Sequence, residues 1–187
     1  MHPNHADEDK ALSRITAKYL RRKPTERMAP FTRDWLIDLH VEIFRKVNDG
    51  IAGKLRKGSA RLGGSGIRVS HHSRIFTDLH NLAADLHVWQ GDPIANAAEL
   101  HWRAVQIHPF NDGNGRWARL LASIWIRQKT GDLLQWPVDI RSTGGSISPL
   151  RKEYLAAMDQ AMGKGEPAAI EDMHRHLTRP WIPPNPK

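Results

Sequence analysis

The chain has 187 residues, 40% of them hydrophobic, with seven tryptophans and no cysteine. This length supports one ordinary hydrophobic core, and the composition excludes a disordered chain, disulfide bonds and thiolate metal sites. The formal net charge of +8 is compatible with a polyanionic ligand or an acidic partner, but charge alone identifies neither.

No apolar run in the sequence is long enough to cross a membrane, and the first ten residues are polar and acidic, unlike a secretory signal. We therefore expect a cytoplasmic protein without a membrane partner, although export by a signal-independent system would leave no mark in the sequence. The tryptophans fit the packing of helices better than a base-stacking platform, so nucleic acid is not the expected partner.

Residues 1–30 are predicted to form an N-terminal arm with one short amphipathic helix, which Pro24 ends. Thr32 is a suitable N-cap for the next helix, in which apolar residues recur at helical spacing as far as Asn48. The segment 50–77 contains no acidic residue but many lysines, arginines and glycines. It is predicted to be a basic, mobile loop or a short hairpin.

Two further helices are predicted from the apolar stripes over residues 75–89 and 94–107. Asp92 and Pro93 provide an N-cap and a first helical position for the second of them. This second helix brings His108 to its C-terminal end.

Residues 108–119 read His-Pro-Phe-Asn-Asp-Gly-Asn-Gly-Arg-Trp-Ala-Arg. Gly113 and Gly115 can adopt positive φ angles, so that consecutive backbone N–H groups point at one anion. A helix is predicted from Gly115 to Gly131, and its N-terminus favours phosphate through the helix dipole. A titratable base, a carboxylate, an anion-binding turn and two guanidinium groups so close together suit a nucleoside triphosphate with its metal ion.

The C-terminal part is predicted to contain a helix from Pro149 to Met162, a last helix from Pro167, and a proline-rich tail over residues 179–187. The coarse pattern is all-α with a small hairpin. Histidines scattered outside the motif lack the spacing of a metal site, and we expect them on the surface: His71, His72, His80, His87, His101, His174 and His176.

Residues 108–119 resemble the signature of the Fic (filamentation induced by cyclic AMP) domain family, His-Pro-Phe-x-Asp/Glu-Gly-Asn-Gly-Arg-x-x-Arg, and match it at every specified position. The stretch lacks the ending of a Walker A loop, and no predicted strand precedes it, as a dinucleotide-binding fingerprint requires. The resemblance covers residues 31–178 and implies an all-α, Fic-like helical bundle with a small β-hairpin flap. The sequence from Phe31 to Leu36 is also similar to short bacterial Fic proteins of the mobile mystery protein B type.

The resemblance implies a role for each residue of the motif. His108 is expected to be the general base that takes the proton of a target hydroxyl, and an ordinary histidine pKa of about 6.5 suits that task. Asp112 is expected to bind Mg²⁺, a hard cation that prefers carboxylate and phosphate oxygens. The phosphate-binding groups are expected to be Gly113, Asn114, Gly115, Arg116 and Arg119, with Arg119 on the terminal phosphates and Phe110 anchoring the loop.

Gly115 separates two chemistries within the family. Members similar to the Doc toxin carry lysine at this position and transfer the γ-phosphate of a reversed nucleotide. Glycine implies a toxin-like protein adenylyltransferase (AMPylase), which joins AMP from ATP to a Tyr, Thr or Ser hydroxyl of a target protein and releases pyrophosphate. Two alternatives stay open: the same site with another donor, such as UTP, GTP or a CDP-alcohol, and a non-catalytic basic module that binds protein or nucleic acid.

In Fic proteins the position of segment 50–77 carries the flap, a hairpin that docks the main chain of the target by strand addition. The flap residues expected here are Arg61, Ile67, Arg68 and Val69, and a solvated glycine-rich loop is the alternative. Many Fic proteins also carry an inhibitory Ser/Thr-x-x-x-Glu-Gly/Asn motif, and no glutamate of this chain has that context. The chain is therefore expected to be either unrestrained or restrained by a separate, antitoxin-like partner that brings such a glutamate to Arg119, and we favour the partner.

Overall fold

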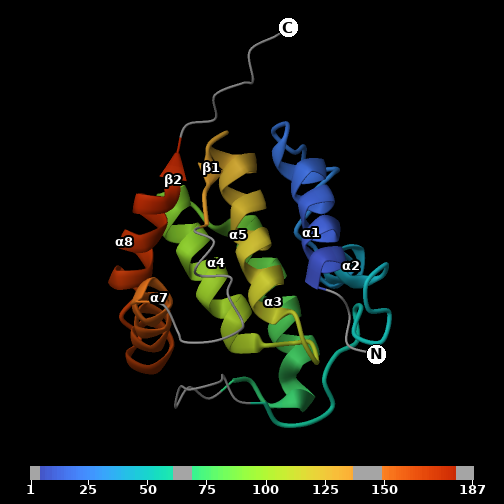
Figure 1. Ribbon diagram of the computed structural model, residues 1–187. Helices are drawn as coiled ribbons and strands as arrows, with labels where there is room; N and C mark the ends of the chain where they lie inside the picture. Colours follow the sequence, from blue (N-terminus) through green and yellow to red (C-terminus); the bar gives the residue numbers. More distant parts are fainter. Residues whose placement is uncertain (1–4, 61–68, 137–148, 180–187) are drawn as a thin grey trace, which may run out of the picture.

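The computed structural model describes residues 5–60, 69–136 and 149–179. Within these ranges the chain forms seven α-helices and one two-stranded sheet (Figure 1). The helices are α1 (His5–Leu20), α2 (Arg33–Phe44), α3 (Ile75–Val88), α4 (Pro93–Ile107), α5 (Asn114–Lys129), α7 (Pro149–Asp159) and α8 (Ala168–Leu177). A 3₁₀ turn (His72–Arg74) leads into α3, and a π-helical turn (Gln160–Lys164) follows α7. The all-α fold predicted from the sequence is confirmed.

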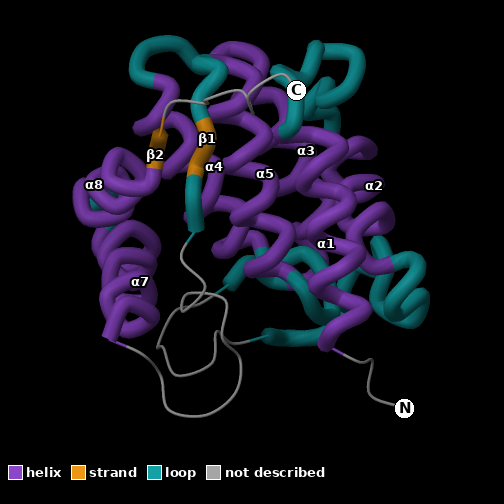
Figure 2. Tube along the Cα trace, turned by 45° about the horizontal axis from the view of Figure 1, so that its top comes forward, coloured by secondary structure: helices purple, strands orange, loops and turns teal. Residues whose placement is uncertain are grey.

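Helices α4 and α5 lie side by side in the middle of the molecule, as Figures 1 and 2 show. Helices α1 and α2 pack against α5, and α8 packs against α4. Every residue of α5 from 117 to 128 is buried, including the large side chains of Trp117 and Trp125. A helix that is covered on all sides must satisfy its polar side chains inside the protein, which matters below for Arg119.

Two of the predicted helix starts have the expected chemistry. The side-chain oxygens of Thr32 and Asp92 each accept a backbone N–H from the first turn of α2 and α4, as N-caps do. Helix α2 is shorter than predicted, because the N–H groups of Val47 and Asn48 both turn back to the carbonyl oxygen of Phe44. Hydrogen bonds of this kind tighten and end a helix.

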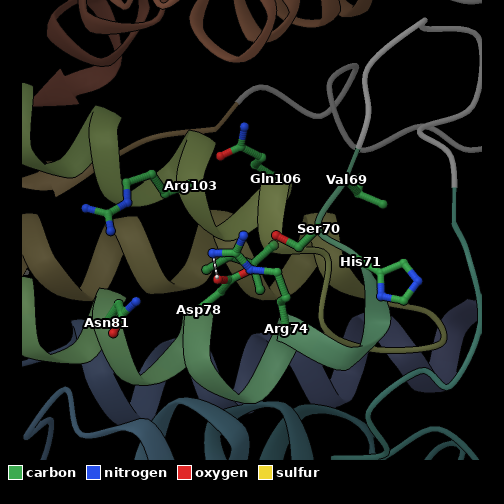
Figure 3. A pocket seen from close by; sticks show the side chains of 9 residues that line it. Val69, Ser70, His71, Arg74, Asp78, Asn81, Arg103 and Gln106 are labelled. Carbon is green, nitrogen blue, oxygen red and sulfur yellow. Dashed lines mark ion pairs between the residues drawn. The ribbon is translucent and has the colours of Figure 1, made fainter.

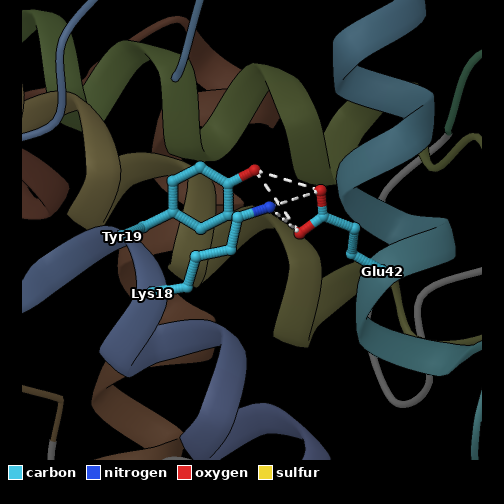
Figure 4. A network of polar contacts seen from close by, with 3 residues as sticks. All are labelled: Lys18, Tyr19 and Glu42. Atoms are coloured by element: carbon cyan, nitrogen blue, oxygen red, sulfur yellow. Dashed lines mark hydrogen bonds and ion pairs between the residues drawn. The ribbon is translucent and has the colours of Figure 1, made fainter.

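The predicted N-terminal arm contributes to the core. Helix α1 packs against α2 and α5, and its side chains Ile15 and Tyr19 are buried in the main hydrophobic cluster. At the surface edge of this contact, Lys18 Nζ lies 2.8 Å from Glu42 Oε2, and the Tyr19 hydroxyl donates to Glu42 Oε1 at 3.3 Å (Figure 4). Removing residues 1–30 would therefore expose part of the hydrophobic core.

The small sheet joins two parts of the chain that the sequence did not connect. Strand β1 (Leu133–Leu134), just after α5, pairs antiparallel with β2 (Thr178–Arg179), just after α8 (Figure 2). Strands of two residues are too short to show an alternating sequence pattern. Their pairing holds the end of α8 beside the end of α5.

The predicted flap residues Arg61, Ile67 and Arg68 lie outside the described residues. Val69 is described and is not in a strand. Before this gap, Leu55 forms an isolated antiparallel bridge with Phe110 of the motif. No helix in the described ranges is long and apolar enough to cross a membrane.

Candidate active site

The motif loop joins the C-terminus of α4 to the N-terminus of α5, and a left-handed residue stands at each junction. His108 ends α4 with φ 48° and ψ 56°, and Gly113 caps α5 with φ 79°. A non-glycine residue in this region costs roughly 1–2 kcal/mol, so the surroundings of His108 must stabilise its backbone.

Arg56 supplies much of that stabilisation, although nothing in the sequence distinguishes it from the other basic residues of its segment. Its side chain is 6% exposed, and the hydrogen bonds that it donates go to main-chain oxygens. Nε donates to the carbonyl of His108 at 2.6 Å, Nη1 to Gly58 at 2.8 Å, and Nη2 to Ile107 at 3.2 Å and to Ser70. The backbone N–H of Arg56 also donates to the carbonyl of Pro109 at 2.9 Å. One buried guanidinium thus ties the start of the motif loop to two other segments.

Phe110 anchors the loop, as predicted from the family resemblance. Its ring is fully buried, stacks on His40 at 3.7 Å between ring centroids, and meets the Trp117 ring edge-on. The Asn114 side chain closes the loop behind it, since Oδ1 accepts the N–H of Phe110 and Nδ2 donates to its carbonyl, both at 2.9 Å. The Asn114 amide is therefore used inside the loop, and its backbone N–H is the group left for an anion.

The two motif glycines differ in what they do. A Cβ atom on Gly113 would lie 2.4 Å from Phe44 Cζ, so both the φ angle and the packing require glycine. Gly115 is a helical residue of α5 without a positive φ, which corrects the expectation that both glycines turn the chain. A Cβ atom there would lie at an ordinary 3.5 Å from Arg119 Nη1.

His40 of α2 is a second residue that the sequence did not reveal. It is fully buried, its Nδ1 accepts the N–H of Gly53 at 3.0 Å, and its Nε2 lies 3.0 Å from the carbonyl oxygen of Asp112. These partners require a neutral ring with the proton on Nε2, and burial lowers the pKa of His40 to about 4. His40 therefore fixes the backbone of Asp112 without adding charge to the site.

The expected base and the expected metal ligand have contrasting environments. Burial lowers the pKa of His108 below its usual value, the nearby Arg56 guanidinium lowers it further, and Asp112 opposes the shift. The Asp112 side chain is 65% exposed, its Oδ1 accepts the N–H of Gly113 at 2.6 Å, and its Oδ2 lies 3.6 Å from Arg116 Nη2. A neutral imidazole at pH 7 can accept a proton, and an exposed carboxylate can reach a cation.

The two arginines of the motif are also unlike each other. Arg116 is partly exposed, with its guanidinium 4.7 Å from the Phe44 ring centroid. Arg119 is only 7% exposed, and the neutral hydroxyl of Tyr154 lies near enough to be its side-chain partner. No ion pair joins Arg119 to a carboxylate within the described ranges. Burial lowers the pKa of Arg119, and the nearby Arg151 and Arg116 lower it further. A buried cation in cationic surroundings favours an anionic ligand.

A cavity of about 170 Å³ opens at these arginines. Arg116, Arg119, Leu120 and Ser123 of α5 line it together with Leu12, Thr16 and Leu20 of α1 and with Leu134 and Trp136. The side chains that α1 presents to the cavity are thus uncharged. Glu26, one of the two arm glutamates, is exposed at the surface.

A second hollow, of about 470 Å³, lies between α3 and α4 (Figure 3). Gln106 and Ile107, the two residues before His108, line it together with Val69, the described member of the predicted flap. Its walls are mainly polar and include the ion pair between Arg74 and Asp78, whose atoms lie 3.7 Å apart.

The family model described as "Fic/DOC family" matches residues 30–126, more than half of the chain. The chain belongs to the Fic/DOC family. The resemblance predicted from residues 108–119 is therefore confirmed. The region that matches the Fic model contains α2, α3, α4 and most of α5, the helices that build and support the motif loop.

Curated Fic proteins are partly similar in sequence. The chain is 28% identical over 110 residues to "Protein adenylyltransferase fic-1" of Caenorhabditis briggsae, a match that covers 58% of this chain and 22% of the relative. It is 31% identical over 93 residues to "Protein adenylyltransferase Fic" of Culex quinquefasciatus, covering 46% and 17%. The chain thus spans about a fifth of the length of these Fic relatives.

Solved Fic structures have the same fold. BepC of Bartonella tribocorum, crystallised with bound AMPPNP, superposes with a TM-score of 0.72 at 18% identity, covering 95% of this chain and 87% of that one. Fic-1 of C. elegans (aa134–508) superposes with a TM-score of 0.67 at 22% identity, covering 91% and 46%. At these identities the likeness establishes the Fic fold alone.

Proposed function

We propose that the protein is an adenylyltransferase that moves AMP from ATP to a Tyr, Thr or Ser hydroxyl of a target protein. The observation that carries the proposal is the buried Arg119, which has a neutral hydroxyl partner and a second guanidinium, Arg116, beside it. Two guanidinium groups near the N-terminal end of a helix suit the binding of a polyphosphate. The names of the curated relatives and the AMPPNP bound to BepC support ATP as the donor.

In the proposed reaction, the target hydroxyl oxygen attacks the α-phosphorus of ATP while His108 accepts the hydroxyl proton. A bond forms between that oxygen and the α-phosphorus, and the bond to the oxygen bridging the α- and β-phosphates breaks. Pyrophosphate leaves with the electron pair of that bond. Because Nδ1 of His108 is buried, we propose that Nε2 is the ring nitrogen that accepts the proton of the target hydroxyl. Arg116 and Arg119 stabilise the charge that develops on pyrophosphate.

Asp112 fits a Mg²⁺ ion that is shared with the ATP phosphates. No cluster of three or more His, Cys, Asp or Glu side chains able to hold a metal occurs in the described part of the chain. Magnesium often takes one or two protein carboxylates plus phosphate oxygens and water, so the exposed Asp112 carboxylate would be its protein ligand. When bound, the ion would neutralise phosphate charge and fix the orientation of the triphosphate.

Gly115 supports AMP transfer over phosphate transfer, as the family resemblance implies. A Cβ atom at this position would lie at an ordinary 3.5 Å from Arg119 Nη1, so a side chain as long as lysine would share the space around the guanidinium. For the target we propose entry beside Val69, because the hollow between α3 and α4 reaches Ile107, directly before His108.

The decisive experiment incubates the protein and a bacterial lysate with Mg²⁺ and either α-labelled or γ-labelled ATP, with His108→Ala as the control. Label from the α-phosphate on protein, lost in His108→Ala, is the expected result. Label from the γ-phosphate would identify a kinase, and no label from either would favour the non-catalytic basic module. Parallel incubations with α-labelled UTP, GTP and a labelled CDP-alcohol test the alternative donors.

We also propose that a separate antitoxin-like protein restrains this toxin-like bacterial enzyme. The uncharged α1 side chains at the cavity of Arg119 support this proposal, because they offer no carboxylate to pair with the guanidinium. Co-expression with the neighbouring genes, followed by purification of the complex, tests whether such a partner exists.

A further inference from the structure

Three helices converge behind Arg119 to form one chain of buried polar side chains. The hydroxyl of Tyr154 on α7 lies near enough to the Arg119 guanidinium to accept a hydrogen bond from it, and lies 3.2 Å from Nε2 of His101 on α4. Nδ1 of His101 lies 3.0 Å from Nε2 of His174 on α8. Tyr154 is 4% exposed and the two histidines are fully buried, contrary to the expected surface position of His101 and His174.

The hydrogen bonds of this chain run in one direction. A guanidinium can only donate, so the oxygen of Tyr154 accepts from Arg119 and its own proton is free to go to Nε2 of His101. His101 then carries its proton on Nδ1 and donates to Nε2 of His174. Burial lowers the pKa of His174 to about 3 and that of His101 well below its usual range, so both rings are neutral at pH 7.

The surrounding packing fixes these groups. The Tyr154 and His101 rings are stacked at 5.7 Å, and Trp136 meets the rings of both histidines edge-on at 4.9 and 5.4 Å. The indole N–H of Trp136 donates to the Ser123 hydroxyl at 3.0 Å, which in turn donates to the Arg119 carbonyl at 2.8 Å. Arg119 is therefore held at its backbone and at its side-chain end.

A hydroxyl partner differs from the carboxylate that usually accompanies a buried arginine. A carboxylate would fix the guanidinium but would also cancel its charge and occupy its donors. A neutral hydroxyl oxygen uses one N–H and leaves the positive charge for an anionic ligand. The two neutral histidines behind Tyr154 keep the hydroxyl oriented and add no charge of either sign.

We propose that Tyr154, oriented by His101 and His174, is the positioning residue that presents the Arg119 guanidinium to the terminal phosphates of ATP. This inference rests on the proposed function, because it takes the role of Arg119 from it. Tyr154 lies on α7, outside the motif. The C-terminal helices α7 and α8 therefore supply the side chains that support Arg119 in the nucleotide site.

The chain offers a matched control, since Tyr19 and Tyr154 are its two tyrosines. Tyr19 is 1% exposed and its hydroxyl contacts Glu42, which is not a motif residue (Figure 4). Tyr154→Phe and Tyr19→Phe each remove one hydroxyl from a buried ring, and both should lower the melting temperature slightly. Tyr154→Phe alone should raise the Kd of Mg-ATP and the KM for ATP about five- to tenfold, whereas the affinity for AMP, which lacks the terminal phosphates, should stay within twofold.

Arg119→Ala separates failure of this inference from failure of the proposed function. If Arg119→Ala leaves the Mg-ATP affinity unchanged, the phosphate-binding role of Arg119 is wrong. If Arg119→Ala weakens ATP binding but Tyr154→Phe behaves like Tyr19→Phe, the positioning role of Tyr154 is wrong.

Should Tyr154→Phe fail to fold, the variants His174→Gln and His174→Met replace it. The amide oxygen of Gln can accept the N–H of His101, so His174→Gln should keep the affinity for ATP. Met offers no such oxygen, so His174→Met should lose affinity for ATP. Equal affinities in these two variants would overturn the inference.

Discussion

Arg56 Nε donates to the carbonyl oxygen of His108 at 2.6 Å, so a side chain 52 positions earlier in the sequence holds the backbone of the proposed base. The same guanidinium reaches the carbonyl of Ile107. Carbonyl groups at the end of a helix lack intrahelical partners, and a positive charge there also complements the helix dipole. Arg56 thus stabilises a left-handed residue that α4 alone would not hold.

Arg56→Lys is expected to lower kcat for AMP transfer at least about tenfold while the Kd of Mg-ATP changes little. A lysine keeps the charge but cannot donate to four carbonyl oxygens at once. Rates of α-label transfer and calorimetry with ATP measure the two quantities, and Arg45→Lys at an exposed position is the control. An unchanged kcat would show that His108 is positioned without Arg56.

Gly113→Ala and Gly115→Ala form a matched pair. The first places Cβ 2.4 Å from Phe44 at a φ of 79°, so we expect a loss of about 2–4 kcal/mol in the free energy of unfolding. The second adds Cβ to a helical position with ordinary contacts, and unfolding should change by less than about 1 kcal/mol. Urea denaturation of both variants measures the difference, and equal losses would contradict the assigned backbone roles.

Asp112→Asn should raise the Mg²⁺ concentration needed for half-maximal transfer several-fold, because a neutral amide is a poorer ligand for a hard cation. The substitution keeps an oxygen that can accept the N–H of Gly113, so the turn is retained. The magnesium titration of Asp112→Asn is compared with that of the unaltered protein. Overlaying titrations would show that the cation is not bound by Asp112.

Buried histidines should make the protein acid-sensitive. The folded-state pKa is about 4 for His40, about 3 for His174 and well below the usual range for His101, whereas each is about 6.5 when unfolded. The unfolded chain therefore binds more protons below pH 6.5, and each histidine removes about 1.4 kcal/mol of stability per pH unit down to its folded pKa. The free energy of unfolding, measured between pH 7 and 4, should fall less steeply in His174→Gln than in the exposed control His176→Gln.

The sequence predicted most of the helices because their boundaries are local. Asp92, Pro93 and Thr32 carry capping chemistry within one turn of the residues they cap, and apolar spacing supplies the rest. The burial of α1 could not be predicted in this way. Its stripe through Ile15 and Tyr19 favours burial, but the sequence does not say against which surface, and in the structure α2 and α5 provide it.

The motif residues were predictable because they are contiguous, whereas their supports are not. Arg56, His40 and Tyr154 reach the site from three different helices or loops, and their sequence neighbours give no sign of it. His101 and His174 are 73 positions apart and form their hydrogen bond only after folding. Long-range pairs of this kind have no signal in a single sequence.

Helix α1 gives a way to test what restrains the enzyme. Leu20, its last residue, lines the same cavity as Arg119, and the other α1 side chains there are Leu12 and Thr16. Because this face is uncharged, the isolated protein should transfer AMP without an activating mutation. Deleting residues 1–30 is not a clean test of this point, since it would also remove Tyr19 from the core.

Leu20→Glu should place a carboxylate in the cavity of Arg119 and reduce AMP transfer at least about tenfold. A carboxylate that pairs with a buried guanidinium cancels the charge needed for the terminal phosphates. Leu20→Gln has nearly the same shape without the charge and should retain most of the activity, and melting temperatures of both variants report whether the core is intact. Equal activity in Leu20→Glu and Leu20→Gln would mean that α1 does not approach Arg119 closely enough to regulate it, and a carboxylate supplied by a partner would then have to reach the guanidinium from another side.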